Sequence, residues 1–320
     1  MMPSMRTYPL AALLLVVGCG KDPAIGGDDT PPIDAPGGGN ADAYIPPSDY
    51  TKLIGRTWSV PGAGHDIYKC VRLTIPTEMY ITDIIAQAPN GTHHTVLSIA
   101  SGNAAGPDGE QDCSVGTLGR TMLYASGVGT DAFSFPQGVG LKVAAGTQLH
   151  LNLHLYNATD DPISNESAIW VKSQTTPPAM LAEMVFAGKI AFAVGTGVRE
   201  ITGGCTVGTG FNLFAVWPHM HKLAIHQKFE VIRGATPSNV LWDSDYDFKE
   251  QKYYGQTPEF QVQAQDQIKV TCRYDNTTGA SVMFGDSSDN EMCFTGMYRY
   301  PSQNASLTQC TDFPAGIPGG

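Results

Sequence analysis

Leucine alternates strictly with polar residues along residues 147–156 (TQLHLNLHLY), and this pattern limits the fold more than any other feature of the chain. Successive side chains of a strand point to opposite faces, so the leucines share one face while His150 and His154 share the other. The pattern predicts a strand whose leucines lie in a core and whose polar face is turned toward water.

The composition favours an all-β fold. Charged residues make up only 15% of the chain, whereas Gly (36) and Pro (22) are plentiful, which suits many short strands joined by turns. No segment has a convincing amphipathic helical pattern. Further strands are expected at residues 211–216, 227–233, 261–272 and 281–284.

Two threonines and two prolines at residues 175–178 mark the best boundary, because consecutive prolines cannot continue a strand ladder. They divide the chain into two similar halves, residues 50–176 and 177–312, each with enough strands for a β-sandwich. We therefore expect two tandem β-sandwich domains of jelly-roll-like architecture, followed by a tail at residues 313–320.

The N-terminus has the pattern of an export signal. Arg6 precedes a short apolar run at residues 10–17, which ends in small residues directly before Cys19. This resembles a bacterial lipobox and predicts a lipoprotein signal peptide at residues 1–18 with lipidation at Cys19; an ordinary cleaved signal or a bare hydrophobic tail are the alternatives. Residues 19–49, rich in Gly, Pro and Asp, are expected to form a disordered tether.

These features predict an exported protein at the bacterial outer membrane or cell surface, in contact with the membrane only through its N-terminal lipid anchor. The net charge of -11 argues against a nucleic-acid partner, which would require a basic face.

Six cysteines remain besides Cys19, and an even number in an oxidising compartment indicates disulfides. If bridges stay within the halves, Cys70 pairs with Cys113. The four cysteines of the second half allow three pairings: Cys205, Cys272, Cys293 and Cys310.

In the first half, His93 and His94 are adjacent and His154 lies on the polar face of the strand described above. Adjacent histidines point to opposite faces of a regular strand, so they share a metal only at a bulge or a strand end, where Gly91 offers the necessary freedom. Taken alone, His154 is more often a hydrogen-bonded strand histidine than a ligand.

In the second half, His219 and His221 are two residues apart, so on a strand both imidazoles reach the same face. Met292 would by itself be ordinary core filler. Together, imidazole and thioether ligands favour copper, particularly Cu(I), over zinc, magnesium or calcium.

This set resembles the copper type II, ascorbate-dependent monooxygenase family, which includes dopamine β-hydroxylase and peptidylglycine α-hydroxylating monooxygenase. The family's double-histidine, third-histidine, His-x-His and Glu-Met-Cys motifs are all matched in order over a span from about Cys70 to Cys310. The matching segments are residues 91–94 (GTHH), 151–157 (LNLHLYN), 219–221 (HMH) and 291–293 (EMC).

The resemblance implies two copper ions, one in each β-sandwich domain, facing across an open cleft. One copper, held by His93, His94 and His154, would pass an electron. The other, held by His219, His221 and Met292, would be the catalytic one that binds dioxygen and attacks the substrate.

The family also implies ascorbate or another external reductant, a small-molecule substrate and dioxygen. Its disulfide pattern adds the bridges Cys272–Cys293 and Cys205–Cys310 to Cys70–Cys113.

The chain departs from the family at positions that concern the substrate. Trp217 stands where the peptide-amidating enzymes have a carboxylate-binding arginine, and Gly296 stands where they have a tyrosine. Asn152 replaces a glutamine before the third histidine, and two disulfides of those enzymes have no cysteines here. The catalytic residues of the family are therefore retained, whereas its substrate-binding residues are replaced. We assign substrate recognition in this chain to Trp217.

We expect a copper-dependent monooxygenase that hydroxylates a C–H bond. The alternative is a non-enzymatic periplasmic copper-binding lipoprotein that handles or senses copper, although such a protein has little use for two different sites. The remaining histidines are expected to be structural or at the surface: His65, His150 and His226.

Overall fold

The computed structural model describes residues 46–62, 64–99, 105–114, 120–127, 130–248 and 250–312. Within these residues the chain has 21 strands and no helix, which confirms the all-β prediction. The strands of the first half are β1 (Thr51–Val60), β2 (His65–Thr74), β3 (Met79–Gln87), β4 (Thr92–Ile99), β5 (Gly109–Asp112), β6 (Thr121–Gly127), β7 (Phe133–Ser134), β8 (Val139–Val143), β9 (Gln148–Asn157) and β10 (Ile163–Gln174).

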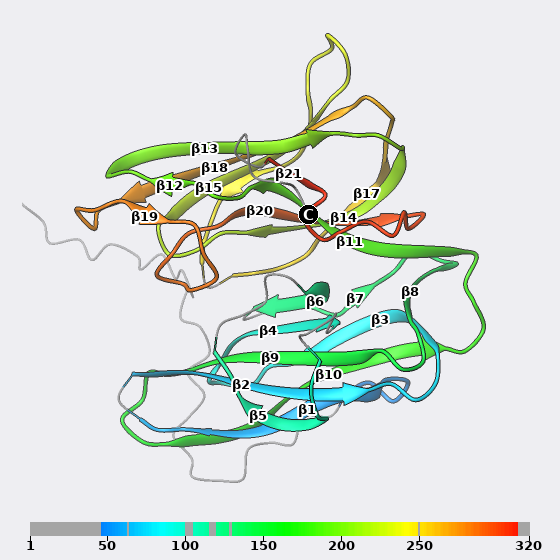
Figure 1. The fold of residues 1–320 in the computed structure, drawn as a ribbon, viewed down its shortest axis with the longest axis vertical. Coiled ribbons are helices and arrows are strands. Elements are labelled where there is room, and N and C mark those ends of the chain that lie inside the picture. The colour runs from blue at the N-terminus through cyan, green and yellow to red at the C-terminus, as the bar shows by residue number, and fades with distance from the viewer. Residues whose placement is uncertain are drawn as a thin grey trace, which may run out of the picture. The chain divides into compact units, whose positions relative to one another are not determined.

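The second half continues in the same way (Figure 1). Its strands are β11 (Met180–Lys189), β12 (Ala193–Val194), β13 (Gly197–Thr206), β14 (Phe211–His219), β15 (Ala224–Ile232), β16 (Asn239–Asp245), β17 (Tyr254–Val262), β18 (Gln267–Asn276), β19 (Val282–Met283), β20 (Cys293–Tyr300) and β21 (Cys310–Asp312).

A five-stranded sheet of order β5-β2-β9-β4-β6 carries the first predicted metal ligands. Its central strand β9 confirms the strand expected at residues 147–156, and all four of its leucines are fully buried. They pack with Ile81, Ile84 and Ile169 of the neighbouring sheet in one hydrophobic core. Burial of four leucines anchors the register of β9, because a slip by one residue would exchange its two faces.

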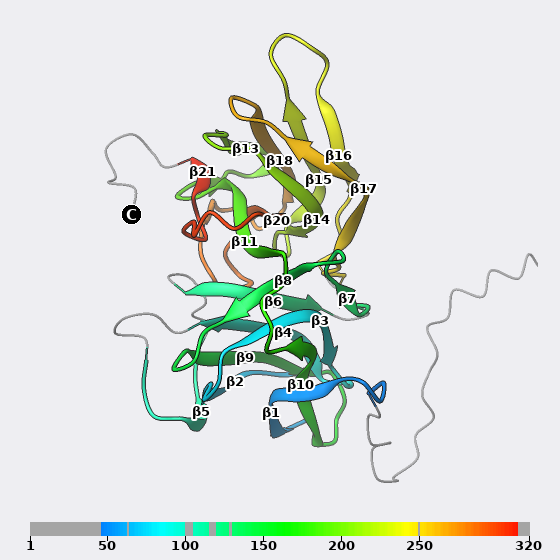
Figure 2. The same ribbon diagram turned by 90° about the vertical axis from the view of Figure 1, so that its right-hand side faces the viewer.

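A ten-stranded sheet runs through both halves, in the order β1-β10-β3-β8-β11-β20-β14-β17, with β7 and β21 paired at its side. The join is a short parallel ladder in which Met180, Leu181 and Ala182 of β11 pair with residues 139–141 of β8 (Figure 2). Residues 43–320 form one compact unit. The division at residue 176 falls between β10 and β11 and stays a prediction.

The second half adds a four-stranded sheet of order β13-β18-β15-β16, which shares a separate core with the outward face of β11, β14 and β20. Sheets stacked over two cores in this way are consistent with β-sandwich domains. The disulfides Cys70–Cys113, Cys205–Cys310 and Cys272–Cys293 are all formed, as predicted.

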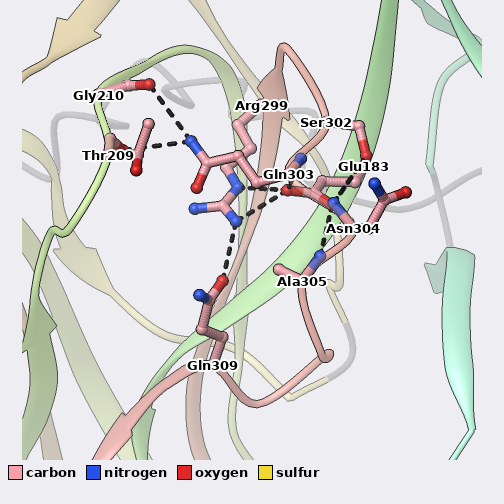
Figure 3. Close-up of polar contacts among 9 residues, drawn as sticks. All are labelled: Glu183, Thr209, Gly210, Arg299, Ser302, Gln303, Asn304, Ala305 and Gln309. Atoms are coloured by element: carbon pink, nitrogen blue, oxygen red, sulfur yellow. Dashed lines mark hydrogen bonds and ion pairs between the residues drawn. The ribbon is translucent and has the colours of Figure 1, made fainter.

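A buried ion pair fastens the segment after β20 to β11 (Figure 3). The Glu183 carboxylate accepts hydrogen bonds from Nε of Arg299 at 2.9 Å and from the backbone amides of Gln303 and Ala305, both at 3.0 Å. The hydroxyl of Ser302 donates to the same carboxylate at 2.9 Å. We call this group the Glu183 clamp; it holds Leu307 beside β11, where the carbonyl of Leu307 accepts from the amide of Phe186.

Two expectations about strands are wrong. The polar face of β9 is not turned toward water, because His150, Asn152 and His154 are at most 3% exposed. The strand expected at residues 261–272 is interrupted between β17 and β18. There Asp266 accepts from the amide of Gln263 and forms an ion pair with Arg233, and these contacts close a turn that the alternating pattern hides.

The predicted signal peptide, the lipidation site Cys19, nearly all of the tether and the tail at residues 313–320 lie outside the described residues. Within the part of the chain that is described, no helix is long and apolar enough to cross a membrane.

Candidate metal centres

The histidine site consists of His93, His94 and His154, the group predicted for the first half. The ladder between β4 and β9 shifts register between Thr92 and His94, and Gly91 has a φ of 95°. This bulge at the start of β4 allows both adjacent histidines to turn toward His154, as the sequence required. The potential ligand atoms of all three residues lie within 4.8 Å of one another.

The spacing of the ring nitrogens fits a metal ion. Nδ1 of His94 lies 3.2 Å from Nδ1 of His93 and 3.3 Å from Nδ1 of His154. Imidazole nitrogens bound at about 2.0 Å with near-tetrahedral angles are about 3.3 Å apart. A trio of imidazole nitrogens is a donor set that suits copper as well as zinc, nickel or iron.

A carboxylate and an aromatic ring orient His154. Its Nε2 hydrogen-bonds to Oδ1 of Asp66, so Nε2 carries the proton and Nδ1 is left as the ligand atom. The ring of Tyr68 stacks on the His154 ring with centroids 4.5 Å apart and an interplanar angle of 6°. Neither Asp66 nor Tyr68 was predicted from the sequence.

Burial keeps the histidine site neutral. It lowers the pKa of His93 to about 4, with a smaller contribution from His154, and lowers the pKa of His94 well below the ordinary value. The pKa of His154 is also lowered by burial, although Asp66 opposes this effect. At neutral pH the ligand nitrogens therefore keep the lone pairs that metal binding requires.

The methionine site consists of His219, His221 and Met292, the group predicted for the second half. His219 is the last residue of β14, and its ring centroid lies 5.2 Å from that of His221. Nδ1 of His219 is 3.1 Å from Oε1 of Gln251, and Nδ1 of His221 is 3.1 Å from the carbonyl oxygen of Asn290. Both Nδ1 atoms therefore donate a proton, which leaves the Nε2 atoms as ligands.

Burial lowers the pKa of His219 to about 3 and that of His221 to about 4. The charge of His221 adds to the effect on His219, whereas the hydrogen bond to Gln251 opposes it. Both imidazoles are neutral at physiological pH and suited to copper.

Glu291 joins the two elements that carry these ligands. Its fully buried carboxylate accepts hydrogen bonds from the backbone amides of His221 at 3.0 Å and Leu223 at 2.7 Å. The next residue, Met292, is 5% exposed, and its carbonyl accepts a 2.6 Å hydrogen bond from the hydroxyl of Tyr274. The glutamate of the Glu-Met-Cys motif thus fixes the histidine turn against the methionine segment.

A cavity of about 50 Å³ lies between the two sites. Its wall includes one ligand of the histidine site and all three ligands of the methionine site: His94, His219, His221 and Met292. Further lining comes from Tyr68, Val96, Met122, Ala125, Asn152, Phe186, Trp217, Gln251, Asp286 and Leu307. Both predicted ligand sets therefore border the same small space.

The open cleft that the family resemblance implies is not shown by this structure. Phe248 lies between the two ligand sets, with ring centroids 4.9 Å from His93 and 6.2 Å from His221. Phe248 therefore contacts one histidine of each ligand set.

Trp217 both packs in the core and lines the cavity. It is 2% exposed and packs against Phe186 in the core, with centroids 6.2 Å apart. It also lines the cavity, and its ring stacks on His219 at 4.7 Å with an interplanar angle of 15°. A Cβ at Gly296 would lie 2.4 Å from Cε of Met184 and 3.3 Å from the Trp217 ring, so the missing side chain leaves room for this packing.

The remaining histidines are not part of either ligand set. His65 donates or accepts through Nδ1 at the carbonyl of Gly62, and His226 forms a 3.1 Å contact with Asp243. His150 is buried on the same face of β9 as His154 and lies outside both sites.

The orienting residues Asp66 and Gln251 were not predicted from the sequence, because no local pattern marks a single carboxylate or amide distant in sequence from its histidine.

Comparison with known proteins agrees with this geometry. Residues 184–314 match the family described as "Copper type II ascorbate-dependent monooxygenase, C-terminal domain", and this range contains the whole methionine site. The second half of the chain is thus similar to the C-terminal domain of the copper type II, ascorbate-dependent monooxygenases. The predicted resemblance to the family is thereby confirmed.

Curated relatives extend the similarity into the first half. "DBH-like monooxygenase protein 1" of Mus musculus is 25% identical over 313 residues, which cover 83% of this chain and 49% of that protein. The Gallus gallus protein of the same name is 26% identical, covering 61% of this chain and 35% of its own length. "Putative DBH-like monooxygenase protein 2" of Homo sapiens is 24% identical, covering 70% and 49%.

The chain therefore spans about half, or less, of the length of these copper monooxygenase relatives. Among solved structures, the major capsid protein P2 of Bacteriophage PM2 aligns over 77% of this chain and 96% of its own, with 10% identity and a TM-score of 0.29.

Proposed function

We propose that this protein is a copper-dependent monooxygenase that hydroxylates a C–H bond of a small molecule. In this reaction one atom of dioxygen enters the substrate and the other leaves as water, while an external reductant such as ascorbate supplies two electrons. The observation that carries the proposal is the pair of unlike ligand sets on one cavity, one built from imidazole alone and the other containing a thioether.

The two sets suit different steps. Copper, when bound at both sites, supplies the one-electron redox chemistry and the dioxygen activation that hydroxylation needs. The histidine site, with neutral imidazoles oriented by Asp66, suits either oxidation state and the relay of an electron. The methionine site, with the soft sulfur of Met292, favours the reduced state that reacts with dioxygen.

The decisive measurement is dioxygen consumption by copper-loaded protein with reductant and a panel of small aromatic compounds. Hydroxylated product should carry label from labelled dioxygen, in equal amount to the dioxygen consumed. Met292→Ala should abolish product formation and remove the sulfur scatterer from the X-ray absorption spectrum of reduced copper. Tight copper binding without substrate-dependent oxygen consumption would instead support a copper-handling lipoprotein.

The cavity wall favours a neutral or amine-bearing aromatic substrate over a peptide. The lining residues of the cavity include the carboxylate of Asp286 and no arginine or lysine. A substrate carboxylate would therefore be buried without a cationic partner, which costs several kcal/mol.

Trp217 provides the recognition surface in this proposal. Its flat ring faces the cavity beside His219, and its buried Nε1 has no hydrogen-bond partner among the described residues. An aromatic substrate contacts the edge of this ring, and a hydroxyl or carbonyl oxygen of the substrate accepts from Nε1.

Steady-state kinetics with a phenethylamine-type compound and a glycine-extended peptide tests this assignment. Trp217→Phe keeps the ring and loses the donor, so kcat/KM for the aromatic compound should fall about fivefold to tenfold, the value of one hydrogen bond. Trp242→Phe is the matched control, because Nε1 of Trp242 is also buried without a partner but its ring packs against Tyr254 and does not line the cavity. Efficient amidation of the peptide by Trp217→Ala would refute the assignment.

We also propose that the protein is exported and anchored by a lipid at Cys19. Three disulfides support an oxidising compartment. Metabolic labelling with a fatty acid, compared between the native chain and Cys19→Ala, tests the anchor; equal labelling of both would exclude it.

A further inference from the structure

Three basic side chains gather on the five-stranded sheet outside both metal sites. Arg72 of β2 pairs with His150 of β9 across the ladder, and Arg120 directly precedes β6. We call these three residues the basic cluster. Burial, together with smaller contributions from the charges of Arg120 and Arg72, lowers the pKa of His150 to about 4. Burial also lowers the pKa of Arg120, and the charge of Arg72 contributes to this effect. The three groups therefore lie close together.

The basic cluster has buried polar atoms that no protein group satisfies. Nε of Arg72, Nη1 of Arg120 and Nδ1 of His150 are all buried without a hydrogen-bond partner, and His150 is only 3% exposed. Buried polar groups are nearly always paired, and an unpaired one destabilises the fold by about 1–3 kcal/mol. Three such atoms at one place indicate that a ligand completes their hydrogen bonds.

The nearby carboxylates are occupied elsewhere, although the chain as a whole is acidic. Asp108 accepts from the amide and hydroxyl of Thr74, and both Glu110 and Asp112 lie within ion-pair distance of Arg56. In the described parts of the chain, no carboxylate pairs with either guanidinium of the basic cluster. Its positive charge is therefore not balanced locally by the protein.

The position of the cluster relates it to the histidine site. His150, Asn152 and His154 share one face of β9, and Asn152 between them lines the cavity. Arg72 lies on the corresponding face of β2, because it pairs with His150 as Cys70 pairs with Asn152. At about 3.3 Å per residue, the cluster is about 13 Å along the sheet from His154.

We propose that the basic cluster binds a small oxyanion and that this anion is the reductant, an anionic enediol of the ascorbate type. Two guanidinium groups offer planar pairs of donors that match adjacent oxygens of such an anion, and neutral His150 adds a further contact through Nδ1. Gly106 lies close against the guanidinium of Arg72, since a Cβ there would lie 2.2 Å from Nη1.

The choice of a reductant rests on the proposed function, whereas the oxyanion site does not. A monooxygenase of this kind needs electrons from outside, and a reductant held at the cluster would share a sheet face with the histidine site while leaving the cavity to the substrate. Inorganic phosphate offers similar oxygens and serves as the competing probe.

The experiment is anaerobic calorimetry of the full copper-free protein with ascorbate and, separately, with inorganic phosphate. Ascorbate should bind with a stoichiometry of one, and phosphate should compete with it. Arg72→Gln and Arg120→Gln should each weaken ascorbate binding about tenfold or more, as expected for lost charge-assisted hydrogen bonds. Arg72→Lys should recover only part of the affinity, because lysine keeps the charge and loses the fork.

Arg199→Gln is the matched control, because Arg199 is exposed on β13 and the variant removes the same charge. Its affinity for ascorbate should equal that of the native chain. The melting temperatures of Arg72→Gln and Arg120→Gln without anion should not fall, since loss of an uncompensated charge relieves repulsion. A large fall in both would assign the arginines a structural role and overturn the proposal.

Two further results would also overturn it: no binding of either anion, or binding that is unchanged in Arg72→Gln and Arg120→Gln. Phosphate binding that depends on the arginines, without any displacement by ascorbate, would overturn the reductant as occupant. In turnover, Arg72→Gln should raise KM for ascorbate while kcat at saturating ascorbate and KM for substrate stay unchanged. Calorimetry needs neither copper nor turnover, so an inactive protein that binds ascorbate refutes the proposed function alone.

Discussion

Removal of the Glu183 carboxylate is expected to destabilise the protein strongly, because the carboxylate and the guanidinium of Arg299 are largely buried. The side chain of Glu183 is 12% exposed and that of Arg299 is 6% exposed. Glu183→Ala leaves the guanidinium of Arg299 buried without its carboxylate, and such a loss costs about 3–5 kcal/mol. Glu183→Gln keeps one acceptor and the shape, so we expect it to cost about 2 kcal/mol, as for weakened charge-assisted hydrogen bonds.

Urea unfolding of the oxidised protein measures these free energies. Glu166→Ala is the control, since Glu166 forms an ion pair of similar length with Lys52 at 2.7 Å but both side chains are at least 33% exposed. The control should lose less than about 1 kcal/mol. A loss below about 1 kcal/mol for Glu183→Ala would refute the view that the clamp is a buried, mutually dependent group.

The pH dependence of stability provides a second assay of the clamp. Burial alone would raise the pKa of Glu183, but the amides of Gln303 and Ala305 and the charge of Arg299 outweigh it, so the pKa lies below its ordinary value of 4.5. A carboxyl group with a lowered folded-state pKa contributes stability that is present above the unfolded-state pKa and is lost as the pH falls through the folded-state pKa. Glu183→Gln lacks this contribution to stability at every pH. The difference in unfolding free energy between native protein and Glu183→Gln should therefore shrink as the pH falls below about 4.5.

Further predictions concern the metal centres. Asp66→Asn should lower the copper affinity of the histidine site, and Gln251→Leu that of the methionine site, each about 10–100-fold. Equilibrium dialysis against a copper chelator measures both affinities. An equal effect of either variant on both sites would contradict the assignment. Native protein should hold two coppers by plasma metal analysis, and Met292→Ala should keep the one at the histidine site. Replacement of both Cys272 and Cys293 by alanine should cost roughly 2–4 kcal/mol in urea unfolding and also weaken Cu(I) at the methionine site, because Cys293 follows Met292 directly.

The sequence predicts best where a local pattern and a chemical requirement coincide. The alternation in residues 147–156 gives β9, and the need for adjacent histidines to share a metal predicts the bulge at Gly91, which the structure confirms. Both ligand sets could be chosen because they need specific side chains at fixed short spacings. The copper occupancy of these sets stays a prediction.

Features that depend on long-range packing were not predictable. The polar face of β9 is buried because the second half and the Cys70–Cys113 segment cover it, and no periodicity encodes that cover. The turn between β17 and β18 is stabilised by Arg233, which follows β15, and the alternation of apolar and polar residues continues on both sides of Asp266. Residues that orient ligands, such as Asp66, are 88 positions from their partners.

The parallel ladder between β8 and β11 determines what would become of the two halves if they were separated. Through these three residue pairs, the first four strands of the sheet order (β1, β10, β3 and β8) meet the rest of the sheet. Each half produced alone would present an unpaired backbone edge, and such edges recruit strands from other copies of the same chain. Isolated halves are therefore expected to self-associate through β8 or β11, and mixing them should restore a soluble one-to-one complex.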